Sequence, residues 1–139
     1  MSPRPPILVG TLHPRLLVDD FAACFRFYDA VLDGLCGAKV AEGNAQGPYA
    51  RWNADDEPVL AVIDRAAMKT MLEVREGDAD TALLCFRLDD VPAAQRLCEE
   101  YGGSVVSAAA PRPEWGPETV VAYVRDPAGH LIELQASPD

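Results

Sequence analysis

The chain has 139 residues, of which 49% are hydrophobic and 24% are charged, a balance typical of one globular domain with its own core. Its formal net charge of −10 argues against nucleic acid and anionic membrane surfaces as partners. No apolar run reaches membrane-spanning length, and the residues after Met1 lack the apolar core of a signal peptide. We therefore expect a cytoplasmic protein. Its four cysteines form no Cys-x-x-Cys pair and are expected to be reduced.

The first half of the chain predicts a strand, a helix and three further strands. Residues 11–18 alternate as a strand does, and Asp20 then offers an N-cap. Apolar residues at helical spacing follow and predict an amphipathic helix that ends before Gly34. The remaining expected elements are strands at 38–43, 49–53 and 59–64, a short helix at 65–73 and a linker at 74–80.

The same pattern then restarts at a constant offset of 70 residues. Val18-Asp19-Asp20-Phe21 aligns with Leu88-Asp89-Asp90-Val91, so a second N-cap and a second helix are expected. Strands are predicted at 81–88, 104–107, 118–125 and 130–136, with a loop at 111–117. Each half reads β-α-β-β-β. One such unit leaves a sheet face uncovered, so the two units are expected to pack together.

The last predicted hairpin contains a carboxylate among apolar neighbours. Pro127 and Gly129 suit a tight turn after Asp126. Beyond the turn, Glu133 alternates with apolar residues on a short strand, which places it on one face of the sheet. We expect Glu133 either in a pocket wall or as a ligand to a bound group. His130 lies in the turn itself and is expected at the surface.

Two motifs give the chain a family resemblance. The closing segment Asp126-Pro127-Ala128-Gly129-His130-Leu131-Ile132-Glu133 resembles the last hairpin of the vicinal-oxygen-chelate superfamily, which includes glyoxalases, bleomycin-resistance proteins and extradiol dioxygenases. The segment Leu16–Tyr28 resembles its first strand and helix. The resemblance implies one α+β domain over residues 1–139, with tandem βαβββ modules at about 10–73 and 80–136. These would form a curved eight-stranded mixed sheet around a cavity, with the helices outside.

In that family four inward strand positions hold a divalent metal ion. Carried over by position, the first is His13, the second-module equivalent is Leu83, and the last strand gives Glu133. The fourth falls at Ala61 or Ile63. Because only His13 and Glu133 can ligate, we expect no cofactor, with a divalent metal on these two residues as the alternative.

The expected cavity has polar anchors and an aromatic lining. Glu133 is the candidate catalytic residue, and in a metal-free enzyme either Glu133 or His13 would act as the general base. Alternatively, Glu133 is a structural residue whose charge is balanced by an inward arginine, Arg15 or Arg87. Of the aromatic residues, Tyr123 is the first candidate for the lining, Trp52 faces either the cavity or the core, and Trp115 is either a lid or a surface residue. The predicted pocket comprises His13, Arg15, Trp52, Leu83, Cys85, Arg87, Trp115, Tyr123, Glu133 and Gln135.

Two functions fit these observations, and the sequence leaves open whether the chain is an enzyme. The first is metal-independent binding or sequestration of a small molecule, as the resemblance to bleomycin-resistance proteins implies. The alternative is a metal-dependent lyase, isomerase or dioxygenase that uses His13 and Glu133. The resemblance also implies a homodimer with contacts at helices or sheet edges.

Overall fold

The computed structural model describes residues 13–68, 84–113 and 116–136, and within these ranges each half of the chain follows the predicted order. The first module contains β1 (Arg15–Val18), α1 (Phe21–Cys36), β2 (Lys39–Gly43), β3 (Tyr49–Ala54), β4 (Glu57–Asp64) and the short α2 (Arg65–Met68). The second contains β5 (Leu84–Arg87), α3 (Val91–Glu100), β6 (Ser104–Pro111), β7 (Val120–Arg125) and β8 (Leu131–Ala136). The α+β class and the tandem modules are confirmed, whereas the linker expected at 74–80 lies outside the described residues.

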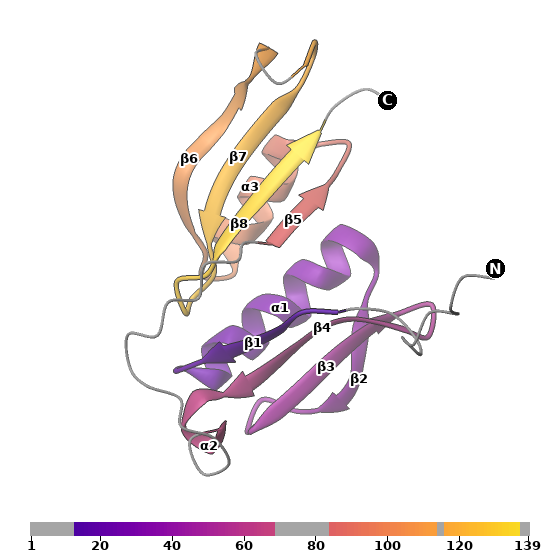
Figure 1. Cartoon of the computed structure of the whole chain (residues 1–139), viewed down its shortest axis with the longest axis vertical. Coiled ribbons are helices and arrows are strands. Elements are labelled where there is room, and N and C mark those ends of the chain that lie inside the picture. The colour runs from indigo at the N-terminus through magenta and orange to yellow at the C-terminus, as the bar shows by residue number, and fades with distance from the viewer. Residues whose placement is uncertain (1–12, 69–83, 114–115, 137–139) are drawn as a thin grey trace, which may run out of the picture.

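The eight strands form two hydrogen-bonded sheets of four. Their orders are β1-β4-β3-β2 and β5-β8-β7-β6, so β1 and β5 occupy equivalent edges. In Figure 1 the sheet of the second module lies above the sheet of the first. The edge strands β5 and β1 are the strands of each sheet that lie nearest the other module. In each sheet the first strand pairs with the fourth in parallel and the other pairs are antiparallel. The two sheets have no strand pairing with each other in the described part of the chain.

Both long helices begin as the sequence predicts. The Asp20 carboxylate caps α1 by accepting a hydrogen bond of 3.1 Å from the Ala23 N–H. The Asp90 carboxylate caps α3 by accepting one of the same length from the Ala93 N–H. The predicted end of α1 before Gly34 is wrong, because α1 continues to Cys36. It ends where Gly37 adopts φ 70° and donates its N–H to Asp33 and Leu32, a left-handed conformation that glycine adopts without a Cβ penalty.

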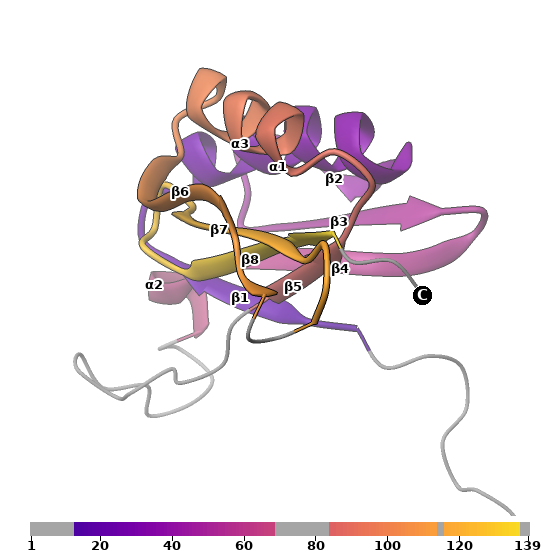
Figure 2. The same ribbon diagram turned by 90° about the horizontal axis from the view of Figure 1, so that it is seen from above.

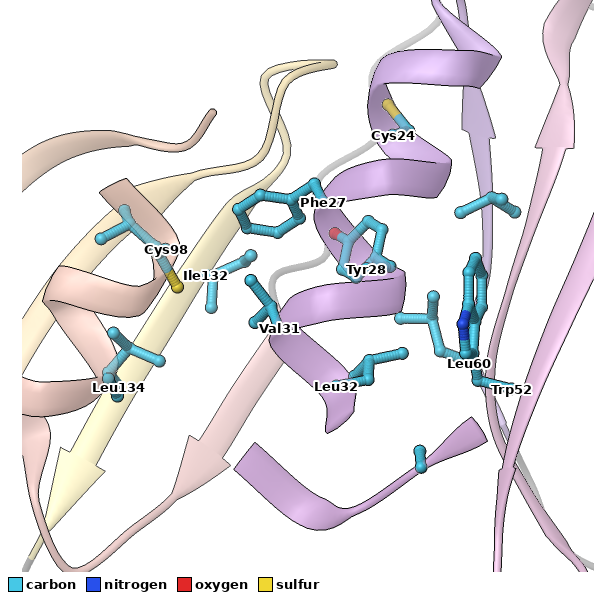
Figure 3. Packing of buried hydrophobic residues seen from close by; sticks show 14 of the residues in the cluster. Cys24, Phe27, Tyr28, Val31, Leu32, Trp52, Leu60, Cys98, Ile132 and Leu134 are labelled. Carbon is cyan, nitrogen blue, oxygen red and sulfur yellow. The ribbon is translucent and has the colours of Figure 1, made fainter. Parts of the chain in front are cut away.

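The helices cover one side of both sheets, as Figure 2 shows, and we call the other side the open face. Helix α1 lies between the sheets in Figure 3, with Phe27 and Val31 toward the second module and Leu32 toward Leu60 of the first. One buried cluster includes residues of both modules. Removal of this apolar surface from water is the main term that holds the modules together.

The contact between the modules depends on a glycine and on a polar network. A Cβ on Gly103 would lie 2.9 Å from the Cys98 carbonyl oxygen and 3.0 Å from the Phe27 ring, so only glycine allows α1 to approach this closely. Nearby, the Tyr28 hydroxyl of α1 donates a hydrogen bond of 2.6 Å to Oδ2 of Asp126, a residue in the turn between β7 and β8. Asp126 is 3% exposed, so this bond ties the first module to the second inside the core.

Candidate functional site

Glu133 lies at the centre of the candidate site, on the open face of the second sheet. Its neighbours in sequence, Ile132 and Leu134, are buried on the helix side, so strand alternation directs Glu133 away from the helices. Glu133 stands opposite Tyr123 in the antiparallel pair of β7 and β8, and opposite Cys85 in the parallel pair of β5 and β8. The site therefore takes one side chain from each of three neighbouring strands.

Both carboxylate oxygens of Glu133 accept a hydrogen bond from these neighbours. The Tyr123 hydroxyl donates to Oε1 at 2.7 Å, and the Cys85 thiol donates to Oε2 at 3.3 Å. A carboxylate has about four acceptor positions, so two neutral donors leave Glu133 able to accept further bonds from a ligand. The arrangement is an anionic acceptor held in place on rigid strands.

These contacts keep the two donors protonated. The hydrogen bond to Glu133 raises the pKa of Tyr123, and desolvation and the negative charge of Glu133 act in the same direction. Burial and the bond to Glu133 raise the pKa of Cys85 to about 11, although the nearby charge of Arg87 lowers it. Cys85 is thus a thiol and not a thiolate at neutral pH, which argues against a nucleophilic role.

We expect substitution of Glu133 by glutamine to make Cys85 more reactive. The negative charge that raises the thiol pKa is removed, and the amide keeps only one acceptor oxygen for the two donors Tyr123 and Cys85, so alkylation by iodoacetamide at pH 8 should become faster. The rate is measured by mass spectrometry in a Cys36→Ser background, because Cys36 is also exposed. The matched control is Glu100→Gln, an exposed glutamate on α3. An unchanged rate in Glu133→Gln would contradict the described contact.

On the first sheet, the open face carries Arg15 and Tyr49. The Arg15 guanidinium carbon lies 5.6 Å from the centre of the Tyr49 ring, and its Nε lies 3.5 Å from Nε2 of His13. Both β1 and β3 pair with β4, and Arg15 and Arg51 lie on either side of Ala61. Tyr49 is two residues before Arg51 on β3, so it shares the same face of the sheet. The predicted pocket residues His13 and Arg15 therefore lie next to each other.

The strand register decides which first-module residue corresponds to Glu133. Cys85 pairs with Glu133, and the residue 70 positions before Cys85 is Arg15, which pairs with Ala61. Ala61 is therefore the equivalent position, and alanine has no atom that can bind a metal ion. The equivalent of His13, Leu83, lies outside the described residues.

The donor set of the described residues does not fit a divalent metal site. No three His, Cys, Asp or Glu side chains cluster anywhere in ranges 13–68, 84–113 and 116–136. Nε2 of His13 also lies beside the positively charged Arg15, which opposes binding of a second cation. We therefore derive no step through a metal ion.

One predicted pocket residue is wrong. Trp52 is 0% exposed and points to the helix side, where its Nε1–H donates to Asp29 Oδ1 of α1 at 3.1 Å. Its ring packs against Phe25 and Tyr28, with centroids 5.3 and 6.3 Å away. Because β3 alternates, the aromatic residue on its open face is Tyr49. Trp115 lies outside the described residues.

The other predicted pocket residues lie on β5 and β8. Cys85 and Arg87 are exposed on β5, and Gln135 is half-buried beside Arg87 in the parallel register. Cys85, Arg87, Tyr123, Glu133 and Gln135 thus form one group on the second module. The expectation that His130 lies at the surface is wrong. Its side chain is 14% exposed and its Nδ1 lies 2.8 Å from Asp126 Oδ2.

A separate hollow of about 360 Å³ lies on the helix side of the molecule. It is lined by Gly34, Leu35, Leu88, Asp89, Asp90, Ala93, Ala94 and Leu97, between α1 and α3. None of these residues belongs to the predicted pocket. The polar groups suited to ligand recognition gather on the open face instead, so we place the candidate site there.

The comparisons with known proteins agree with this fold. The sequence matches the model of the Glyoxalase/Bleomycin resistance protein/Dioxygenase superfamily over residues 10–134, and the chain belongs to that superfamily. A search of curated proteins gives no match. No helix in the described residues is long and apolar enough to cross a membrane.

Solved structures show the same architecture at low sequence identity. A glyoxalase-related enzyme from Fulvimarina pelagi aligns with a TM-score of 0.74 and 19% identity, covering 96% of this chain and 90% of that one. The fosfomycin resistance protein FosX from Mesorhizobium loti aligns with a TM-score of 0.62 and 16% identity, covering 95% of both chains. At these identities the likeness extends to the fold alone.

Proposed function

We propose that the chain binds a small organic molecule on the open face of its sheets, without a metal ion. The observation that supports this most is Glu133, whose two oxygens are held by Tyr123 and Cys85 while acceptor capacity remains. Small-molecule sites commonly combine a few fixed polar groups with a preformed surface. The open face supplies such groups on rigid strands.

Metal-dependent catalysis is the less favoured function. It needs a third ligand, and Ala61 occupies the position that corresponds to Glu133. A metal ion would also have to compete with Tyr123 and Cys85 for the carboxylate of Glu133. Metal-free binding uses the contacts of Glu133 as they are. The homodimer implied by the family resemblance stays a prediction, which light scattering would test.

A ligand screen with site variants tests the proposal. Drug-like aromatic compounds are screened by thermal shift, and the affinity of each stabilising compound is measured by calorimetry. We expect Glu133→Gln and Tyr123→Phe each to weaken binding roughly tenfold. Glu133→Gln removes the negative charge that strengthens hydrogen bonds from a ligand, and Tyr123→Phe removes the neutral hydrogen bond that holds the carboxylate. Glu100→Gln and Tyr101→Phe, exposed on or just after α3, are the matched controls.

Two outcomes would count against the proposal. One is a screen in which no compound stabilises the chelator-treated protein. The other is a set of ligands whose affinities are the same for Glu133→Gln, Tyr123→Phe and the two controls. The second outcome would place any binding outside the open face.

A further inference from the structure

Three arginines project from the open face of a strongly acidic chain. Arg15 on β1, Arg51 on β3 and Arg87 on β5 all project from this side, because strand alternation sends their neighbours Leu16, Trp52 and Phe86 toward the core. The whole chain has 22 acidic and 12 basic residues. Three arginines on one face are therefore contrary to its average charge.

Arg51 and Arg15 differ in how their guanidinium groups are held. Arg51 forms an ion pair with Glu42 at 3.2 Å and donates to Asn53 at 3.2 Å, so its charge is locally balanced. Arg15 instead rests against the Tyr49 ring and beside His13, contacts that orient the guanidinium without neutralising it. Its planar fork of N–H donors suits a carboxylate or a phosphate-like group.

Arg15 and Arg87 lie on the inner edge strands of the two modules. Strands β1 and β5 are the edges at which the sheets approach each other in Figure 1. Both side chains are exposed. Arg87 is also two residues along β5 from Cys85, on the same face of the sheet, and pairs with Gln135 while Cys85 pairs with Glu133. A molecule at this seam would meet guanidinium groups and the acceptor Glu133 together.

We propose that the ligand of the open face carries an anionic group, a carboxylate, phosphonate or phosphate, bound by Arg15 and Arg87. This inference rests on the proposed function and names the chemical class of its ligand. A hydroxyl or amino group elsewhere on the ligand donates to Glu133, since a second anion there would be repelled. The two modules thus contribute one arginine each to a single site.

Calorimetry with three small probes tests the charge requirement. Phenylphosphonate and benzoate carry an anionic group on a benzene ring, and benzamide is the neutral match of benzoate. We expect both anions to bind the full chain more tightly than benzamide, with affinity that falls as salt is raised. A difference between the two anions identifies which group the arginines prefer. Equal binding of benzoate and benzamide would overturn the inference.

Arginine variants then locate the anion. Arg15→Gln and Arg87→Gln should each weaken anion binding roughly tenfold or more, because each removes a charge-assisted hydrogen bond. Arg15→Lys should retain part of the affinity, since it keeps the charge and loses the planar fork. The control is Arg96→Gln, an exposed arginine on α3 that changes net charge equally. Equal losses in Arg96→Gln and the site variants would overturn the inference.

The two proposals fail in different ways. If benzamide or another neutral compound binds as well as the anions, and Glu133→Gln weakens it, the anion requirement is wrong while the binding function holds. If neither the probes nor the wider compound screen gives any binding, both proposals are wrong.

Discussion

Substitution of Asp126 by asparagine is expected to lower the free energy of unfolding by about 3 kcal/mol. The Asp126 side chain is 0% exposed and accepts bonds from the Tyr28 hydroxyl, His130 Nδ1 and the N–H groups of Ala128 and His130. An amide keeps the shape but removes the charge and one acceptor, so a donor of the buried network loses its partner. Urea denaturation followed by circular dichroism measures the change.

The loss should depend on pH in a defined direction. Burial alone raises the pKa of Asp126, but the hydrogen bonds from His130 and Tyr28 outweigh it, and the net pKa is lowered from the ordinary 3.8. A carboxylate with a lowered folded pKa adds stability above its unfolded pKa and loses it as pH falls through the folded one. The difference between wild type and Asp126→Asn should therefore be full at pH 7 and shrink below about pH 4.

The control for this comparison is Asp89→Asn, which changes an exposed carboxylate before α3. It should leave stability within about 0.5 kcal/mol of wild type. An equally small effect of Asp126→Asn at pH 7 would contradict the structural account of the module contact. A Tyr28→Phe variant removes only one bond of the network and should cost about 2 kcal/mol.

Substitution of Trp52 by alanine is expected to have an effect of similar or larger size. The side chain is fully buried against Phe25 and Tyr28, so its removal leaves a cavity and should cost about 3–5 kcal/mol. The affinity for any open-face ligand should stay unchanged at a temperature where the variant remains folded. Chemical denaturation and calorimetry measure the two effects separately.

A milder variant guards against complete unfolding. Trp52→Phe keeps an aromatic ring and removes the hydrogen bond to Asp29, so a smaller loss of stability is expected. The matched open-face variant is Tyr49→Phe, which keeps the ring beneath Arg15. Weaker ligand binding in Trp52→Phe, with unchanged stability, would return Trp52 to the pocket and refute its core position.

The sequence predicts most of the fold because its signals are local. The offset of 70 residues, the capping aspartates Asp20 and Asp90 and the helical spacing of apolar residues each depend on a few neighbouring positions, and the structure confirms them. The end of α1 was harder to predict. Two glycines, Gly34 and Gly37, both suit a helix end, but a Cβ on Gly34 would clash with Leu97 of α3, so Gly34 serves the close approach of the two helices and only Gly37 ends the helix.

The candidate site depends on pairings between strands, which the sequence shows less directly. The contact of Tyr123 with Glu133 could have been found from the turn, because a hairpin closed at Asp126 and His130 places these two residues opposite each other. The contact with Cys85 requires the parallel register of β5 and β8, and no local signal gives it. Alternation in β3 shows that Trp52 and Tyr49 face opposite sides, but packing against α1 decides which one is buried.

The most direct test of the central claim is a calorimetric titration with the tightest compound from the screen, on chelator-treated protein. Metal content is determined on the same sample, and the titration is repeated with added manganese, nickel or zinc salt. The proposed function predicts the same affinity in every case and a roughly tenfold loss in Glu133→Gln. Binding that appears only after metal is added, or that Glu133→Gln leaves intact, would contradict it.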